Sequence, residues 1–233
     1  MNPGWRWALT AGLSVAAVLT GSQLFHLMRE HRDAAASAAA AAGSLPETSI
    51  VAQPRAGIQP QTGIPAQLPA FSLSDLAGHP TPVSQWQGKS LMINFWATWC
   101  APCRREIPLL QTLHHEFKDG DFEVLGIAVD FPDKVRGFRD QYKITYPLLV
   151  GEQDALDLIA KLGVATPAFP FTVFTDRRGR IVTLYLGELN RPVAAAILAT
   201  VEDVNRDRLE LAAARTRIAD EVRALRANLQ SVE

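Results

Sequence analysis

The sequence predicts an α/β protein with a central mixed sheet flanked by helices. Two mostly apolar runs, 90–97 and 122–129, are typical of strands buried on both faces, as in parallel sheets. Helical patterns follow each of these runs. Two later apolar runs, 171–175 and 181–186, are joined by a short turn at Gly179 and therefore predict an antiparallel hairpin.

The other elements are predicted from the same patterns. The expected order is strand 70–73, strand 82–84, strand 90–97, helix 102–117, strand 122–129, helix 133–143, strand 146–150, helix 154–162, strands 171–175 and 181–186, and a helix from Arg191. This order is that of the thioredoxin fold, with a strand and a helix added near 145–162.

The only two cysteines, Cys100 and Cys103, lie between a predicted strand and a predicted helix. This layout is typical of a thiol–disulfide redox site. Cys100 would lie at the helix N-terminus, where free N–H groups and the helix dipole stabilise a thiolate. Cys103 would lie one turn further along, where it can resolve a mixed disulfide. We therefore predict that Cys100 is the exposed nucleophile and Cys103 the shielded partner.

Two other uses of these cysteines are less favoured. A structural zinc site needs four Cys or His ligands. The sequence has no second cysteine pair, and His114 and His115 are adjacent, so they point in different directions and are expected in solvent. A disulfide between residues three apart closes a loop too small to stabilise the fold much. We expect no metal, and no cofactor other than the redox-active Cys100–Cys103 disulfide.

The sequence around the cysteines, NFWATWCAPC at 94–103, resembles the TlpA/ResA family of membrane-anchored, thioredoxin-like thiol–disulfide proteins. The segments YPLL at 146–149 and FPFTVFTD at 169–176 resemble the same family. The resemblance covers about residues 69–198 and neither end of the chain. It implies a thioredoxin-like fold and thiol–disulfide exchange with protein substrates.

The resemblance also implies roles for residues near the dithiol. Pro170 is expected to be a cis proline that faces Cys100 and Cys103 and to share the catalytic role with them, whereas Pro167 is the competing position. A substrate-binding surface is expected from four neighbours: Trp99, Ala101, Pro102 and Phe169. For Phe169 the alternative is a partly exposed hydrophobe with no special role.

The proton acceptor for Cys103 is not identified by the sequence. Asn94 occupies the strand position at which thioredoxins carry a buried Asp, and an amide cannot take a proton. Asp75, in the early hairpin, is a candidate, and the alternative is that it is a surface turn residue.

The N-terminal part predicts a membrane segment. Residues 7–28 contain no Asp, Glu, Lys or Arg and are long enough to cross a bilayer. A retained anchor is favoured over a cleaved signal peptide, whose cleavage site would fall at 34–37. Arg6 precedes the segment and Arg29 and Arg32 follow it. This charge difference weakly favours a cytoplasmic location for the part of the chain after the segment. The resemblance places the redox domain in the periplasm, on a single-pass anchor in the bacterial inner membrane.

The expected organisation has four parts: a membrane anchor at 1–28, an Ala- and Pro-rich stalk and linker at 29–68, a thioredoxin-like domain at 69–198, and an amphipathic helix at 199–233. In the last part apolar residues recur at intervals of seven, with partly filled positions between them: Val204, Leu211, Ile218, Leu225 and Val232, then Val201, Val222 and Leu229. Arg208 and Arg215 interrupt this seam. The pattern predicts one continuous helix that pairs with a second copy or a partner through 203–232, and the alternative is packing on its own domain.

The leading interpretation is a membrane-tethered oxidoreductase that reduces disulfides in extracytoplasmic proteins. Family resemblance implies substrates of cytochrome c or metal-centre maturation and a membrane electron donor for re-reduction. A net charge of −1 predicts no affinity for nucleic acid. The alternatives are a disulfide oxidant or isomerase, and a redox-linked docking module with little turnover. Peroxide reduction is less favoured, because the Thr and Arg that surround a lone peroxidatic cysteine are not evident.

Overall fold

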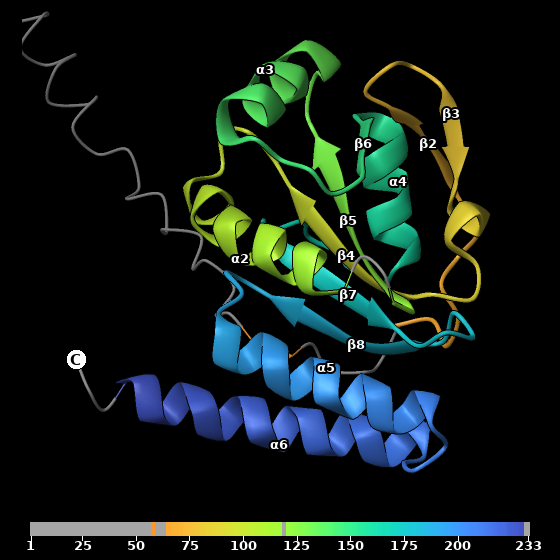
Figure 1. Ribbon diagram of the computed structural model, residues 1–233, viewed down its shortest axis with the longest axis vertical. Helices are drawn as coiled ribbons and strands as arrows, with labels where there is room; N and C mark the ends of the chain where they lie inside the picture. Colours follow the sequence, from red (N-terminus) through yellow and green to blue (C-terminus); the bar gives the residue numbers. More distant parts are fainter. Residues whose placement is uncertain (1–56, 59–63, 118–119, 231–233) are drawn as a thin grey trace, which may run out of the picture. The chain divides into compact units, whose positions relative to one another are not determined.

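The computed structural model describes residues 57–58, 64–117 and 120–230. Within them the chain forms an eight-stranded sheet with the order β1-β8-β7-β4-β5-β6-β2-β3 and helices on both faces (Figure 1). The strands are β1 (Gly57–Ile58), β2 (Ser72–Asp75), β3 (Pro80–Pro82), β4 (Ser90–Trp96), β5 (Phe122–Val129), β6 (Leu148–Gly151), β7 (Phe171–Thr175) and β8 (Ile181–Leu186). The helices are the 3₁₀ helix η1 (Val83–Trp86), α2 (Ala101–Phe117), α3 (Pro132–Tyr142), α4 (Gln153–Lys161), α5 (Arg191–Asn205) and α6 (Leu211–Gln230).

The predicted mixed sheet is confirmed. β4 is parallel to β5 and β5 to β6, whereas β7 runs antiparallel to both β4 and β8. Every residue of β4 is buried, because helices cover both faces of the sheet. Met92 and Trp96 pack with α2 and α5 on one face, and Ile93 and Phe95 pack with α4 on the other. The added strand and helix predicted near 145–162 are β6 and α4.

The early hairpin differs from its prediction. The second strand was expected at 82–84, but β3 ends at Pro82 and residues 83–86 form η1 instead. This turn of helix buries the indole of Trp86, which is 8% exposed, among the residues that pack with α4. Burial of a large aromatic side chain outweighs the strand tendency of two residues.

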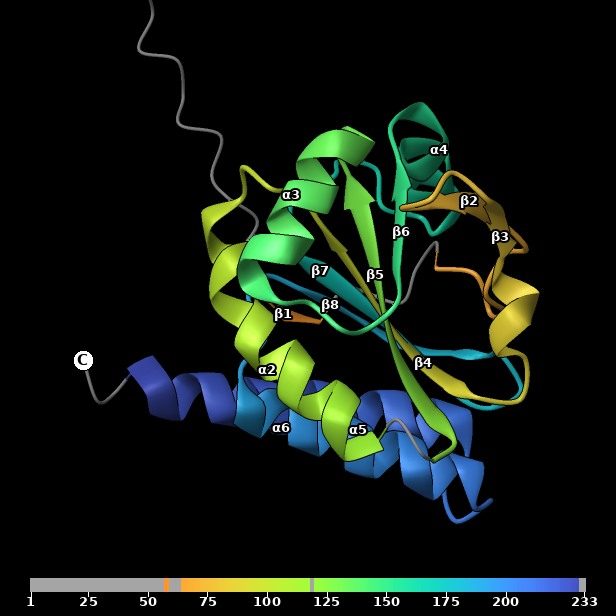
Figure 2. The ribbon, with the colours of Figure 1, turned by 45° about the horizontal axis from the view of Figure 1, so that its top comes forward.

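The short strand β1 lies inside the segment predicted as linker. Gly57 pairs with Leu186 of β8, Leu186 pairs with Phe171 of β7, and Phe171 pairs with Phe95 of β4. Figure 2 shows β1 beside β8. Since β4 continues from Phe95 toward Cys100, β1 begins at the end of the sheet that carries the cysteines.

The prediction of one continuous C-terminal helix is wrong. α5 ends at Asn205, and α6 starts at Leu211 and lies along α5 (Figures 1 and 2). The chain turns at Asp207, which has a φ of 53°, a left-handed conformation that Asp tolerates better than most residues. Arg208 then donates hydrogen bonds to Asp203 across the turn.

The seam of apolar residues is covered within the same chain. Val201 and Val204 of α5 and Ile218 and Val222 of α6 belong to one buried cluster. The residue that breaks the seam, Arg215, donates to the carbonyl oxygen of Ile181 in β8 at 2.6 Å. The structure therefore favours the alternative that the sequence left open, packing on its own domain.

The predicted anchor at 7–28 and the stalk up to residue 56 lie outside the described residues. Among the residues described, no helix is both long and apolar enough to cross a bilayer.

Candidate redox site

The two cysteines lie where a central strand turns into a helix. β4 ends at Trp96, and the N–H of Cys100 donates to the carbonyl of Ala97 at 3.1 Å before α2 begins at Ala101. Cys100 and Cys103 form a disulfide, so the predicted pairing is confirmed. The backbone N–H of Cys103 points at the sulfur of Cys100, with 3.3 Å between the two atoms. In the reduced protein, this N–H and the helix N-terminus both stabilise a thiolate on Cys100.

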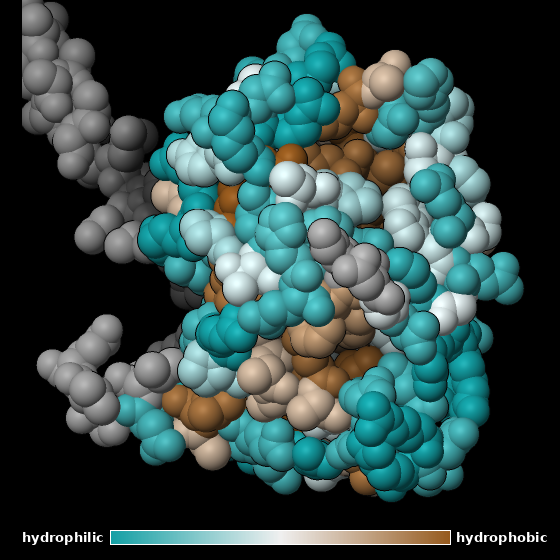
Figure 3. Space-filling view, in the orientation of Figure 1, coloured by the Kyte–Doolittle hydropathy of each residue, from teal (hydrophilic) through white to brown (hydrophobic). Residues whose placement is uncertain are grey.

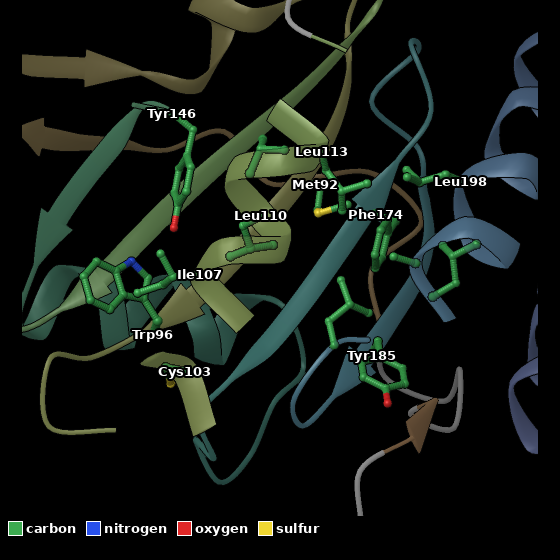
Figure 4. Close-up of a cluster of buried hydrophobic side chains, with 14 of the residues drawn as sticks. Met92, Trp96, Cys103, Ile107, Leu110, Leu113, Tyr146, Phe174, Tyr185 and Leu198 are labelled. Atoms are coloured by element: carbon green, nitrogen blue, oxygen red, sulfur yellow. The ribbon is translucent and has the colours of Figure 1, made fainter. Parts of the chain in front are cut away.

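Both cysteines are more covered than the sequence suggested. Cys100 is 5% exposed and Cys103 is 1% exposed, so the predicted order holds but Cys100 is not an exposed residue in the disulfide form. Both belong to the buried cluster on the α2 face of the sheet, and Figure 4 shows Cys103 near Trp96 and Ile107 at one edge of that cluster. A substrate must therefore approach the Cys100 sulfur from the protein surface that surrounds it.

Aromatic side chains lie on the surface beside Cys100. Trp99 is 65% exposed, and the edge of its ring meets Phe169 with 5.9 Å between centroids. The Phe169–Pro170 peptide bond is cis, which confirms the prediction over Pro167. Pro170 is buried, and its carbonyl accepts a hydrogen bond from Gly187. Phe169 forms no backbone hydrogen bond with any described residue, so its N–H and C=O remain available.

The other two residues predicted for substrate binding, Ala101 and Pro102, form the first turn of α2. Ala101 is exposed and Pro102 half-buried. Both side chains are small and uncharged.

A buried carboxyl group, Glu106, lies one helical turn beyond Cys103. Glu106 is 1% exposed, and its two oxygens accept hydrogen bonds from the Asn94 amide at 2.8 Å and from the N–H of Leu189 at 2.7 Å. Burial raises the pKa of Glu106 to about 8, and these two hydrogen bonds oppose that rise. A carboxyl group with this pKa exchanges protons near neutral pH, as a proton acceptor for a thiol requires.

Glu106 was not predicted from the sequence, and Asp75 was the candidate instead. Asp75 is a surface turn residue: its carboxylate accepts from the N–H groups of Ala77 and His79 and contacts the His79 ring. The signal for Glu106 was present. It lies three residues after Cys103 and just before Ile107, so the helical period places an acidic residue on the apolar face of α2.

Asn94 contributes to the site although its amide cannot take a proton. Its amide donates to Glu106 and, at 3.1 Å, to the hydroxyl of Thr172. Because an amide carries both donors and an acceptor, a turn of the Asn94 side chain lets it accept from Glu106 when that group is protonated. Asn94 can therefore serve both protonation states of Glu106.

No group of three or more His, Cys, Asp or Glu side chains gathers within the part of the chain that the structure describes. His114 was expected in solvent, but its side chain is 13% exposed and its ring lies 3.1 Å from Glu123. Tyr146 packs against the same ring, so His114 is a partly buried packing residue.

An apolar groove of about 500 Å³ lies apart from the dithiol, between α2 and α5, where Figure 3 shows hydrophobic side chains in a hollow. Its lining contains neither cysteine. It is not part of the redox site.

A dithiol between a buried strand and a helix, together with a cis proline directly before β7, places this protein among the thioredoxin-fold thiol–disulfide oxidoreductases, which carry out exchange with their own cysteine pair. Residues 64–185 match the AhpC/TSA family, and the chain belongs to that family.

Two relatives support this class. The chain is 34% identical over 131 residues to the thioredoxin-like protein YneN of Bacillus subtilis, covering 54% of this chain and 72% of YneN. It is 32% identical over 124 residues to the thiol-disulfide oxidoreductase ResA of Geobacillus kaustophilus, covering 53% of this chain and 69% of ResA. Among solved structures, a DsbF homologue from Corynebacterium diphtheriae matches with a TM-score of 0.51 and 25% identity, over 64% of this chain and 92% of that chain.

Proposed function

We propose that this oxidoreductase acts chiefly as a reductant, with Cys100 as the nucleophile, Cys103 as the resolving thiol and Glu106 as the proton acceptor. The reducing direction is proposed from the family resemblance, and the observation that carries the role of Cys100 is the contact between the Cys103 N–H and the Cys100 sulfur at the start of α2. It favours negative charge on Cys100 rather than on Cys103. Glu106 is placed on the same face of α2 as Cys103, the thiol that must lose its proton second.

The reaction proceeds in two exchanges. The Cys100 thiolate attacks one sulfur of a substrate disulfide, the substrate S–S bond breaks, and the other substrate sulfur leaves as a thiolate. Glu106 takes the proton of Cys103, whose thiolate attacks Cys100 in the mixed disulfide. The second substrate thiol is released. The substrate gains two electrons from the two cysteines and two protons, one that Glu106 took from Cys103 and one from solvent, which received the Cys100 proton when that thiol ionised. The protein is left with the Cys100–Cys103 disulfide.

We place the substrate-binding surface around the Cys100 sulfur. Trp99 and Phe169 would contact the substrate, Ala101 and Pro102 would leave room for its chain, and Pro170 would hold Phe169 in place. The free backbone groups of Phe169 support pairing with an extended substrate segment.

The location and substrates are proposed from the family resemblance. Residues 7–28 would anchor the protein in the bacterial inner membrane with the domain in the periplasm. A membrane electron donor would re-reduce it, and proteins of cytochrome c or metal-centre maturation would be its substrates. The position of β1 supports this arrangement, because the chain enters the sheet at the end that carries Cys100. A tether there would keep the dithiol close to the membrane.

The first test traps the intermediate. A Cys103→Ser variant of the full chain, expressed in cells, should accumulate mixed disulfides through Cys100, because the resolving thiol is gone. Mass spectrometry would identify the attached proteins. The matched Cys100→Ser variant should carry at least tenfold fewer adducts. Equal trapping by both variants would reverse or abolish the assigned roles.

Two further assays separate the alternatives. A docking module would hold partners without turnover, so the reduced full chain would not reduce the disulfides of insulin repeatedly in the presence of a chemical reductant. An oxidant would stay largely reduced at equilibrium with glutathione, whereas the proposed reductant would be largely oxidised.

A further inference from the structure

A pocket of about 420 Å³ opens beside Trp99 and has no part in the exchange chemistry proposed above. Its apolar walls are the exposed rings of Trp99 and Phe131 and, between them, Val129 and Leu156. We call it the Trp99–Phe131 pocket. Trp99 and Phe131 are the two most exposed large hydrophobic side chains among the described residues, at 65% and 52%. Two such rings facing one cavity next to a reactive sulfur indicate a binding surface rather than chance exposure.

The two walls are held together by a buried carboxylate. Asp130, which is 6% exposed, accepts hydrogen bonds from the N–H and hydroxyl of Thr98 at 3.1 and 2.5 Å. Its other oxygen accepts from the N–H of Phe131 at 2.8 Å. Thr98 directly precedes Trp99, so Asp130 joins the loop that carries the dithiol to the loop that carries Phe131. The pocket is therefore formed before a substrate binds, which lowers the entropic cost of binding.

The charges at the rim leave one carboxylate unpaired. The ammonium of Lys134 lies 5.0 Å above the Phe131 ring and 4.0 Å from Asp130, so its charge is largely offset. Glu152, on the opposite rim, is exposed and makes no ion pair or side-chain hydrogen bond with the described part of the chain. The pocket thus combines an apolar interior with an unpaired negative charge at its edge.

We propose that the Trp99–Phe131 pocket binds an aromatic or long aliphatic side chain of the disulfide-bearing protein substrate, next to a Lys or Arg of the substrate that faces Glu152. The pocket continues the surface at which substrate meets Cys100, since Trp99 borders both. The proposal rests on the proposed function, and it adds selection among disulfides by the residues that flank them.

The test uses the reduced full chain in detergent and measures second-order rate constants for oxidation of its dithiol. The probes are peptides closed by one disulfide, with Phe or Ala placed about two residues outside each cysteine, the distance an extended chain needs to pass the Trp99 ring. Hydroxyethyl disulfide, which has no side chain to fill the pocket, is the reference. The wild-type protein should favour the Phe peptide over the Ala peptide by about tenfold.

Substitutions then locate the preference. Phe131→Ala should reduce the Phe-over-Ala ratio to about one, while Tyr142→Ala, which removes another exposed aromatic ring outside the pocket, should leave it unchanged. In a second peptide pair with Arg or Asp beside the Phe, Glu152→Lys should reverse the preference for Arg, and the effect should weaken as salt is added.

Two results would overturn the pocket proposal: equal rates for the Phe and Ala peptides with the wild-type protein, or an unchanged preference in Phe131→Ala. Both results count only if the protein is oxidised by hydroxyethyl disulfide at a measurable rate. No reaction with any disulfide, the reference included, would instead overturn the proposed function and the pocket with it.

Discussion

At the scale of single residues, Glu106 gives the site its pH dependence. Its carboxyl group is raised to a pKa of about 8 mainly by burial, from an ordinary value of 4.5. Between these two values the folded protein holds a proton that the unfolded chain has released. The free energy of unfolding therefore falls as pH rises through this window, by about 1.4 kcal/mol per pH unit at most. Below pH 4.5 both states are protonated and the effect is absent.

The first prediction concerns Glu106→Gln. Gln stays neutral, and with Asn94 turned it can keep both hydrogen bonds, so this variant should lack the fall in stability between pH 4.5 and 8. Denaturant unfolding of the oxidised protein should show it about as stable as wild type near pH 4.5 and more stable near pH 8. Its rate of disulfide exchange should nevertheless fall by about 100-fold, since the proton acceptor for Cys103 is lost.

Glu116→Gln is the matched control. Glu116 is also on α2, but it is exposed and pairs with Arg191 at the surface. It should change neither the pH slope nor the exchange rate by more than a small factor. Parallel stability curves for wild type and Glu106→Gln would contradict the assignment of Glu106.

At the scale of elements, the α5–α6 pair covers the outer face of β8. Ala214, Ile218 and Val222 of α6 are buried, and the other residues of that helix whose burial the structure describes are half-buried or exposed. Asp203 is the link at the turn between the two helices: it accepts from Arg208 and Arg217, and these hydrogen bonds lower the pKa of its carboxyl. The helix pair thus behaves as part of the domain and not as an unpaired arm.

The second prediction follows from this packing. Ile218→Ala should lower the free energy of unfolding by about 2–5 kcal/mol, because a fully buried side chain is shortened at a helix interface. Arg223→Ala on the exposed face of α6 should change it by less than about 0.5 kcal/mol.

Sedimentation of both variants and the wild type distinguishes packing of α6 on its own domain from pairing of α6 in a dimer. If the apolar face of α6 served a dimer instead, Ile218→Ala would change the association state, and the unfolding midpoint would depend on protein concentration.

At the scale of the whole molecule, the first described residues of the chain, Gly57 and Ile58, belong to the sheet. β1 pairs with β8, and α6 contacts both strands. A strand of the sheet therefore lies inside the stretch predicted as a linker of 29–68. A tether attached there would be shorter than the sequence suggested and would emerge at the dithiol end of the sheet.

The third prediction is that residues 7–28 are retained as an anchor. The full chain should stay with the membrane fraction after extraction at alkaline pH, and the mass of the mature protein should include its N-terminus. A chain that starts at Gly57 should be released into the soluble fraction. A mature N-terminus between residues 34 and 43 would show a cleaved signal peptide instead.

Much of this protein could be read from short stretches of its sequence. The buried strands, the helices between them and the Cys100–Cys103 pair each follow from residues that are neighbours in the chain, whereas the cis bond at Pro170 was expected from the family resemblance. Local patterns suffice because each of these features is set by side-chain periodicity or by a turn of a few residues. The prediction of one long helix also relied on local pattern, and it failed because the turn at Asp207 carries neither Gly nor Pro to mark the end of a helix.

The features that the sequence did not reveal depend on contacts between distant segments. The pKa of Glu106 is set by burial between α2 and the sheet, with Asn94 of β4 and Leu189 after β8 as its partners. The pocket beside Trp99 is assembled from the loop before α2, the start of α3 and the start of α4. Desolvation and cavity shape exist only once these segments meet, so no pattern along the chain encodes them directly.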